Sequence, residues 1–207
     1  WYASHLYIGQ VNQRNFDEYK RAKGEIVETS ESRVIKQMIG EFQFFLGHLN
    51  VDVKDTRYRI LEDKQRIGYK SKKVKDDVDY FYNVVIGEKP PEKYKQIFFP
   101  DITIFYPNKP AEYVEIELSR HDSKENKKSF MKKLFKLQGT SRTVYFIFAD
   151  NNYSHHIKLI REFEELSTRK FKSLYVCKMS DYKKRGAMYA FREFKGIPLP
   201  RKRKKKQ

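Results

Sequence analysis

Two short stretches decide the fold: Phe99-Pro100-Asp101-Ile102-Thr103-Ile104-Phe105-Tyr106 and Tyr113-Val114-Glu115-Ile116-Glu117-Leu118-Ser119-Arg120. Apolar and polar residues alternate in each stretch, which is typical of a half-buried β-strand. The residues between them, Pro107, Asn108, Lys109 and Pro110, favour a turn. We therefore expect these two stretches to form a β-hairpin.

The hairpin can bring three carboxylates together. Side chains alternate between the two faces of a strand, so Tyr113, Glu115 and Glu117 share one face and the aliphatic residues between them share the other. Asp101 opens the partner strand. Clustered carboxylate oxygens bind hard cations such as Mg²⁺. The alternative, in which Glu115 and Glu117 only line the wet face of a strand, stays open from the spacing alone.

Length and composition predict one folded domain, or one domain with appendages. The 207 residues include 16 Phe and 15 Tyr, and 39% of them are hydrophobic, which is enough for a core. No apolar run approaches the roughly 18 residues of a membrane-spanning helix, and no secretory signal is visible. Because the chain starts at Trp1 and not at Met, we expect a fragment of a longer protein. The single Cys177 excludes an intramolecular disulfide and fits a reducing compartment such as the cytoplasm.

The charge predicts a polyanionic partner. Lysine and arginine outnumber acidic residues by 44 to 27, which gives a net charge of +17. Such an excess favours nucleic acid through counterion release. A membrane surface fits less well, because no basic amphipathic stretch is free of core residues. The basic run 201–206 follows two prolines and is expected to be an unstructured tail.

Two helices flank the hairpin in sequence. The first begins at Thr29 or Ser30 and ends near Asn50, with apolar residues at helical spacing and Glu41 in its middle. From periodicity alone, Glu41 is better explained as a solvated position. The second helix, 123–137, carries many lysines beside an apolar stripe and ends at Gly139. Its lysines fit a helix that lies along a polyanion, and a solvated lysine face is the alternative.

The remaining elements complete an α/β pattern. We expect a strand at 57–61, a basic connection at 64–75, an undecided helix or strand at 78–86, a central strand at 143–149, a helix capped by Ser154 and a strand at 173–179. His155 and His156 begin that last helix, and adjacent histidines on a helix point apart. Right-handed crossovers would place 143–149 beside the hairpin, in a mixed sheet with helices on both faces. The expected division is an extension at 1–28, the α/β domain at 29–195 and the tail at 196–207.

The hairpin residues resemble a known nuclease signature. Pro100-Asp101 on one strand and Glu115-Ile116-Glu117 at the end of the next are similar to the PD-(D/E)XK motif, with the Glu41 helix ahead of it and the lysine-rich helix behind it. The family usually has lysine where this chain has Glu117. Some members carry glutamate there, and others bring the lysine from a neighbouring element, for which Lys124 and Arg120 are nearby candidates.

A narrower resemblance is to the replication-relaxation proteins of plasmids and integrative elements. The residues that carry it are Phe99-Pro100-Asp101 and then Glu115-Ile116-Glu117 with Arg120 close behind, followed by a basic helix and an apolar strand. Those proteins often carry a winged-helix domain ahead of this region. This resemblance implies a role in the replication or transfer of a mobile genetic element, with replication or transfer proteins as further partners.

The nuclease resemblance implies a site and a chemistry. Asp101, Glu115 and Glu41 would hold Mg²⁺ or Mn²⁺, while Glu117 and Lys124 would complete the catalytic set. The DNA backbone would be held by Arg120, Lys127, Lys128, Lys132, Lys72 and Lys73. The expected activity is that of a metal-dependent DNA endonuclease or nickase.

The competing hypothesis is a nuclease fold with a degenerate site that binds DNA or a partner without cleavage. Glu117 at the lysine position favours this alternative, and the intact carboxylates favour the enzyme. An RNA-binding protein would fit the charge but would leave the carboxylates unexplained. The sequence leaves the oligomeric state open, and a dimer is compatible with it.

Overall fold

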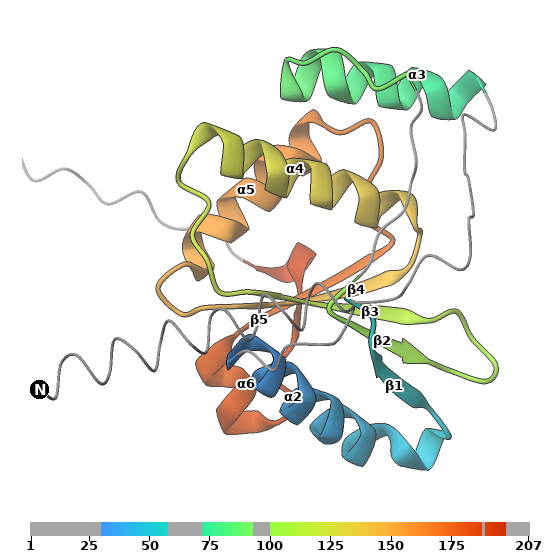
Figure 1. Ribbon diagram of the computed structural model, residues 1–207, viewed down its shortest axis with the longest axis vertical. Coiled ribbons are helices and arrows are strands. Elements are labelled where there is room, and N and C mark those ends of the chain that lie inside the picture. The colour runs from blue at the N-terminus through green and yellow to red at the C-terminus, as the bar shows by residue number, and fades with distance from the viewer. Residues whose placement is uncertain (1–29, 58–71, 93–99, 188, 198–207) are drawn as a thin grey trace, which may run out of the picture.

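The computed structural model describes residues 30–57, 72–92, 100–187 and 189–197. They form an α/β structure in which a mixed six-stranded sheet is flanked by helices (Figure 1). Helices α2 and α6 cover one face of the sheet, α4 and α5 cover the other, and α3 lies outside α4. Within this described part, no helix is both long enough and apolar enough to cross a membrane.

The helices have the following bounds: α2 Ser30–Leu46, α3 Lys72–Tyr80, α4 Lys124–Gly139, α5 Tyr153–Leu166 and α6 Met179–Arg185. A π-helix, Phe81–Ile86, continues α3, and 3-10 helices span Gly47–Leu49 and Phe194–Gly196. The strands are β1 Asp52–Asp55, β2 Ile102–Phe105, β3 Glu112–Glu117, β4 Thr143–Phe148, β5 Ser173–Lys178 and β6 Arg192–Glu193.

The strands follow one another across the sheet in chain order, β1 to β6. The hairpin β2–β3 is antiparallel, with Ile102 opposite Val114, and β1 extends it with Val53 opposite Ile104. β3, β4 and β5 are parallel, and β6 is antiparallel to β5. The predicted hairpin, the position of 143–149 beside it and the mixed sheet are thus confirmed.

The two faces of the sheet bury separate cores. On one face, α2 contributes Ile35, Met38 and Phe42 against Val114 and Ile116 of β3. The other core lies between the sheet and α4, α5 and α3, and includes ring stacking between Phe81 and Phe135 with centroids 4.1 Å apart. Because the aliphatic residues of β3 face α2, its glutamates face α4.

The helix ends follow local sequence signals. Asn50 adopts the left-handed conformation at φ 55° directly after the 3-10 helix that continues α2, as expected for a residue that ends a helix. Ser123 caps α4 by accepting a hydrogen bond from the Asn126 backbone at 3.1 Å. α5 is preceded by Asn152 and not by Ser154, so the predicted cap was wrong by two residues. The undecided stretch 78–86 is helical.

The first strand differs from the prediction. Strand β1 ends at Asp55 and Arg57 lies in a turn, whereas a strand was expected to begin at Arg57. The rest of that expected strand and most of the basic connection lie outside the described residues, as do the extension 1–28 and nearly all of the tail 196–207. The described elements from Ser30 to Gly196 share the single sheet or pack on it.

Candidate functional site

The two glutamates at the end of β3 are buried. Glu115 is 1% exposed and Glu117 is 6% exposed, because α4 packs over this face of the strand. The alternative that they line a wet strand face is therefore wrong. Buried carboxylates need compensating partners, and the surrounding elements supply them.

Asp101 is joined to β3 by two hydrogen bonds. Its Oδ2 accepts from the Ile116 backbone N–H at 2.8 Å, and its own backbone N–H donates to Glu115 Oε1 at 3.3 Å. Asp101 lies just ahead of β2, where the hairpin pairing places it next to the end of β3. The hairpin thus brings Asp101 and Glu115 together, as the sequence predicted.

Lys133 of α4 completes this group. Its ammonium donates to Glu115 Oε2 at 2.9 Å and also to Glu117 Oε1. Its side chain is 32% exposed, whereas those of Glu115 and Glu117 are 2% and 8% exposed. One lysine therefore bridges both buried glutamates from the helix above them, and sequence reasoning missed this residue.

The electrostatics of the group are set by burial and by Lys133. Burial raises the pKa of Glu115 to about 8 against the attraction of Lys133, and burial also raises the pKa of Asp101. Burial alone would raise the pKa of Glu117, but the hydrogen bond from His121 and the charge of Lys133 outweigh it and lower that pKa. Burial alone would lower the pKa of Lys133, and the two glutamates reverse this and raise it. Glu117 and Lys133 are therefore charged at neutral pH, while Glu115 loses its proton only near pH 8.

Three members of the group border a pocket of about 450 Å³, while the buried Glu115 lies behind them. The pocket is lined by Val34, Asp101, Ile116, Glu117, Leu118, Ser119 and Lys133. Two carboxylates, a lysine and a loop after a strand end therefore meet at a solvent-accessible hollow. Such a hollow is large enough for part of a polar substrate.

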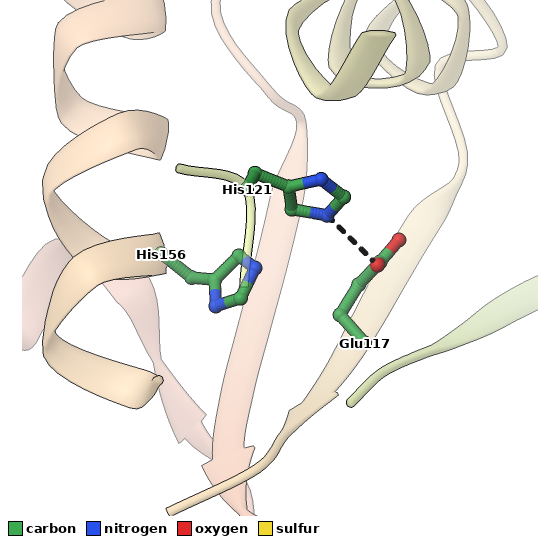
Figure 2. Close-up of side chains that lie close together, drawn as sticks. All are labelled: Glu117, His121 and His156. Carbon is green, nitrogen blue, oxygen red and sulfur yellow. Dashed lines mark hydrogen bonds and ion pairs between the residues drawn. The ribbon is translucent and has the colours of Figure 1, made fainter. Parts of the chain in front are cut away.

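A second group lies next to the first and shares Glu117. The His121 Nε2 is 3.1 Å from Glu117 Oε2, and His156 of α5 lies beside them (Figure 2). One ligand atom from each of these three residues lies within 4.8 Å of the others, so the cluster could hold a metal ion. The adjacent His155 points elsewhere and lies 3.2 Å from the His121 carbonyl oxygen. The expectation that His155 and His156 diverge is thus confirmed, but the partner that His156 finds, His121, was missed.

The structure separates Glu41 from the proposed metal ligands Asp101 and Glu115. Its carboxylate accepts a hydrogen bond from Gln37 at 2.9 Å. Of the residues of α2, Val34 lines the pocket, and Glu41 lies two turns further, about 10 Å along the helix axis. Glu41 instead lies near the Tyr182 hydroxyl, whose pKa is raised by burial and by this carboxylate.

The predicted catalytic Lys124 also lies away from the carboxylates. It is the exposed first residue of α4, more than two turns before Lys133. Arg120 is on the loop after β3 and pairs with Asp122 at 2.8 Å, with both side chains more than half exposed. Lys133, and neither of these two candidates, occupies the position beside the motif.

The lysines predicted to bind DNA fall into two classes. Those in the middle of α4 have acidic partners: Lys127 pairs with Glu162 at 2.6 Å, and Lys128 and Lys132 pair with Glu88 at 3.1 and 2.6 Å. Lys72 and Lys73 are exposed at the start of α3, on the outer layer of the structure. The lysine face of α4 is therefore partly neutralised within the chain itself.

Comparisons of the chain with protein-family models, with curated proteins and with solved structures find no match.

Proposed function

We propose that this protein binds DNA and hydrolyses its phosphodiester bonds with metal assistance, through a PD-(D/E)XK-type site in which Lys133 takes the place of the motif lysine. One observation carries the proposal: Lys133 reaches from α4 to within 2.9 Å of Glu115 and also contacts Glu117, which occupies the usual lysine position. A lysine of α4 therefore lies beside the two glutamates, although strand β3 itself carries none at this position.

The element order supports the same assignment. A helix precedes the hairpin, the hairpin carries Asp101 and Glu115, and a basic helix leads to a parallel strand beside β3. This matches the arrangement that the resemblance to the nuclease family implies. The finer fold assignment, PD-(D/E)XK-like within the α/β class, is part of the proposal.

Asp101 and Glu115 fit a hard divalent cation by their chemistry. Both offer carboxylate oxygens, and burial raises the pKa of each even though Lys133 lies nearby, so a divalent cation would stabilise their charged forms further. When bound, Mg²⁺ or Mn²⁺ would activate a water and stabilise charge on the phosphate. Glu41 lies too far along α2 to bind the same ion, so the proposed metal ligands are Asp101 and Glu115 without the Glu41 that the sequence suggested.

Lys133 and Glu117 would then have distinct tasks. The Lys133 ammonium borders the pocket, where it can hold a phosphate oxygen and stabilise developing negative charge. Glu117 retains a lowered pKa and stays charged, so it positions Lys133. Glu117 is thereby a positioning residue.

The DNA backbone would be held beside the pocket by Arg120. This residue follows Ser119, which lines the pocket, and its exposed ion pair with Asp122 contributes little and can give way to a phosphate. Lys127, Lys128 and Lys132 could contribute only by exchanging Glu162 and Glu88 for phosphates. The net charge of +17 supplies the general attraction.

A second candidate function is DNA binding without cleavage. One observation favours it: Lys133 already compensates both buried glutamates, so the group is internally satisfied. For either function, the sequence resemblance to replication-relaxation proteins supports a role in the replication or transfer of a plasmid or integrative element in the cytoplasm, with proteins of those processes as partners.

Incubation with supercoiled plasmid and Mg²⁺ or Mn²⁺ separates the two candidates, with Asp101→Asn beside the unaltered protein. Nicking or linearisation that the variant loses is the expected result. DNA binding that Asp101→Asn leaves unchanged, with no cleavage by either protein, would instead support the non-cleaving module. Absence of DNA binding at low salt would contradict both.

A further inference from the structure

His156 carries an unusual buried nitrogen. The residue is 0% exposed, and its Nδ1 lies 3.0 Å from the Asn152 carbonyl oxygen. A carbonyl oxygen can only accept a hydrogen bond, so Nδ1 carries the proton and Nε2 presents a bare lone pair. Among the described residues, Nε2 has no hydrogen-bond partner. A buried acceptor without a donor is rare in folded proteins and needs a physical explanation, and a bound ion would provide one.

The unpartnered nitrogen faces the other two members of the cluster. His121 and His156 have ring centroids 5.2 Å apart in an edge-to-face arrangement. Figure 2 shows a ring nitrogen of His156 on the side toward His121, which in turn points at Glu117. The three ligand atoms lie within 4.8 Å of one another, which a modest side-chain adjustment can close around one ion.

Neighbouring groups orient these three side chains by hydrogen bonds and ring stacking, as the groups around the ligands of a metal site do. The Nδ1–H of His156 donates to a backbone carbonyl, as metal-binding histidines usually do. Lys133 holds the other carboxylate oxygen of Glu117. His121 stacks on Phe130 with centroids 4.9 Å apart, and His156 stacks on Phe148 at 4.6 Å.

We propose that Glu117, His121 and His156 bind a zinc-class divalent transition metal ion and leave a fourth position open. Two imidazole nitrogens and one carboxylate oxygen form a donor set that suits Zn²⁺, whereas Mg²⁺ prefers oxygen alone. The ion takes the place of the proton between His121 and Glu117, and that proton leaves to solvent. Nε2 of His156 then gains the partner that it lacks.

This site is separate from the proposed Asp101–Glu115 site and does not depend on DNA cleavage. Glu117 connects the two, because it lines the pocket and belongs to the cluster. The half-buried His121 and the pocket give an ion a path from solvent.

Calorimetric titration with Zn²⁺, followed by Co²⁺ absorption spectroscopy, tests the proposal on the full chain. His156→Phe removes the orphaned nitrogen and keeps an aromatic ring among Phe130 and Phe148. His48→Asn is the matched control, because His48 is exposed on the 3-10 helix after α2. His121→Asn provides a second cluster variant at a partly exposed position, should His156→Phe fail to fold.

The expected result is one equivalent of Zn²⁺ whose affinity falls by more than about 100-fold in either cluster variant, since loss of an outer-shell partner alone costs 10–100-fold. The His48→Asn variant should bind as the unaltered protein does, and Co²⁺ should show tetrahedral d–d bands that the cluster variants lose. Absence of binding, or equal binding by His48→Asn and both cluster variants, would overturn the proposal.

Discussion

The Lys133 ammonium lies 2.9 Å from Glu115 Oε2 across 18 residues of chain, and it also contacts Glu117. Helix α4 is therefore tied to β3 by a buried charged group as well as by apolar packing. The same contacts place a lysine beside the two acidic residues of the proposed nuclease motif. Stability and function can be tested at this one position.

Lys133→Met should destabilise the protein by roughly 3 kcal/mol, because it leaves two buried glutamates without their common partner. This loss lies at the low end of the range for breaking a buried ion pair, because 32% of the Lys133 side chain is exposed. Urea unfolding measures the change. Lys128→Met is the matched control on the same helix, and it should have a much smaller effect because the side chain of its partner Glu88 is 39% exposed, whereas Glu115 and Glu117 are buried. Equal effects of the two substitutions would contradict the buried bridge.

The raised pKa of Glu115 predicts a stability that falls with increasing pH. Its pKa is about 8 in the folded protein and about 4.5 in the unfolded chain. Between these values the folded state binds more protons, so unfolding becomes easier as pH rises from about 4.5 to 8. Glu115→Gln should remove this component of the pH profile, measured as the urea midpoint at several pH values. A profile unchanged by Glu115→Gln would show that Glu115 is not the group responsible.

The lowered pKa of His156 predicts the opposite effect, a stability that falls as the pH decreases in the acid range. Burial lowers its pKa to about 4 from the ordinary 6.5, so the unfolded chain takes up a proton before the folded protein does. The contribution of neutral His156 is fully present above pH 6.5 and is lost as pH falls toward 4. In His156→Phe this acid-induced loss should be smaller by about 2–3 kcal/mol. Thermal unfolding between pH 4 and 7 measures it, and identical slopes for both proteins would contradict the assignment.

Gly186 should tolerate no side chain. It adopts φ 80° at the end of α6, and an added Cβ would lie 2.9 Å from Cζ of Phe45. Gly186→Ala should therefore destabilise the protein by more than 2 kcal/mol or so, through strain and displacement of Phe45. Gly87 is the control, because it has φ 70° but a Cβ added there would meet no neighbouring atom within 4 Å. Gly87→Ala should therefore lower the free energy of unfolding by only about 1 kcal/mol. Thermal unfolding of both variants compares them directly.

The sequence predicted the elements whose periodicity is unambiguous. The apolar stripes of α2 and α4 and the alternation in the hairpin all correspond to observed elements. Strand β1 was missed because its four residues are mostly charged and only Val53 is buried. Its pairing with β2, and not its composition, makes it a strand.

The carboxylate pair of the site was predictable, and its surroundings were not. Asp101 and Glu115 meet because hairpin register follows from local sequence. Lys133 is one of several lysines on α4, and only the packing of that helix over β3 selects it. A position next to the apolar stripe does not single it out, because Lys136 also precedes a buried leucine. His121 and His156 lie on different elements, and their meeting depends on how α5 packs against the end of β3.

In the proposed function, Lys133 performs the role that the motif lysine performs in the nuclease family. The most direct measurement is the rate of Mg²⁺- or Mn²⁺-dependent plasmid cleavage by Lys133→Met and by Lys124→Met, with duplex DNA affinity measured in parallel. We expect Lys133→Met to abolish cleavage while the folded variant still binds DNA, and Lys124→Met, at an exposed position on the same helix, to remain active. Cleavage at an unchanged rate by Lys133→Met would show that Lys133 does not have this role.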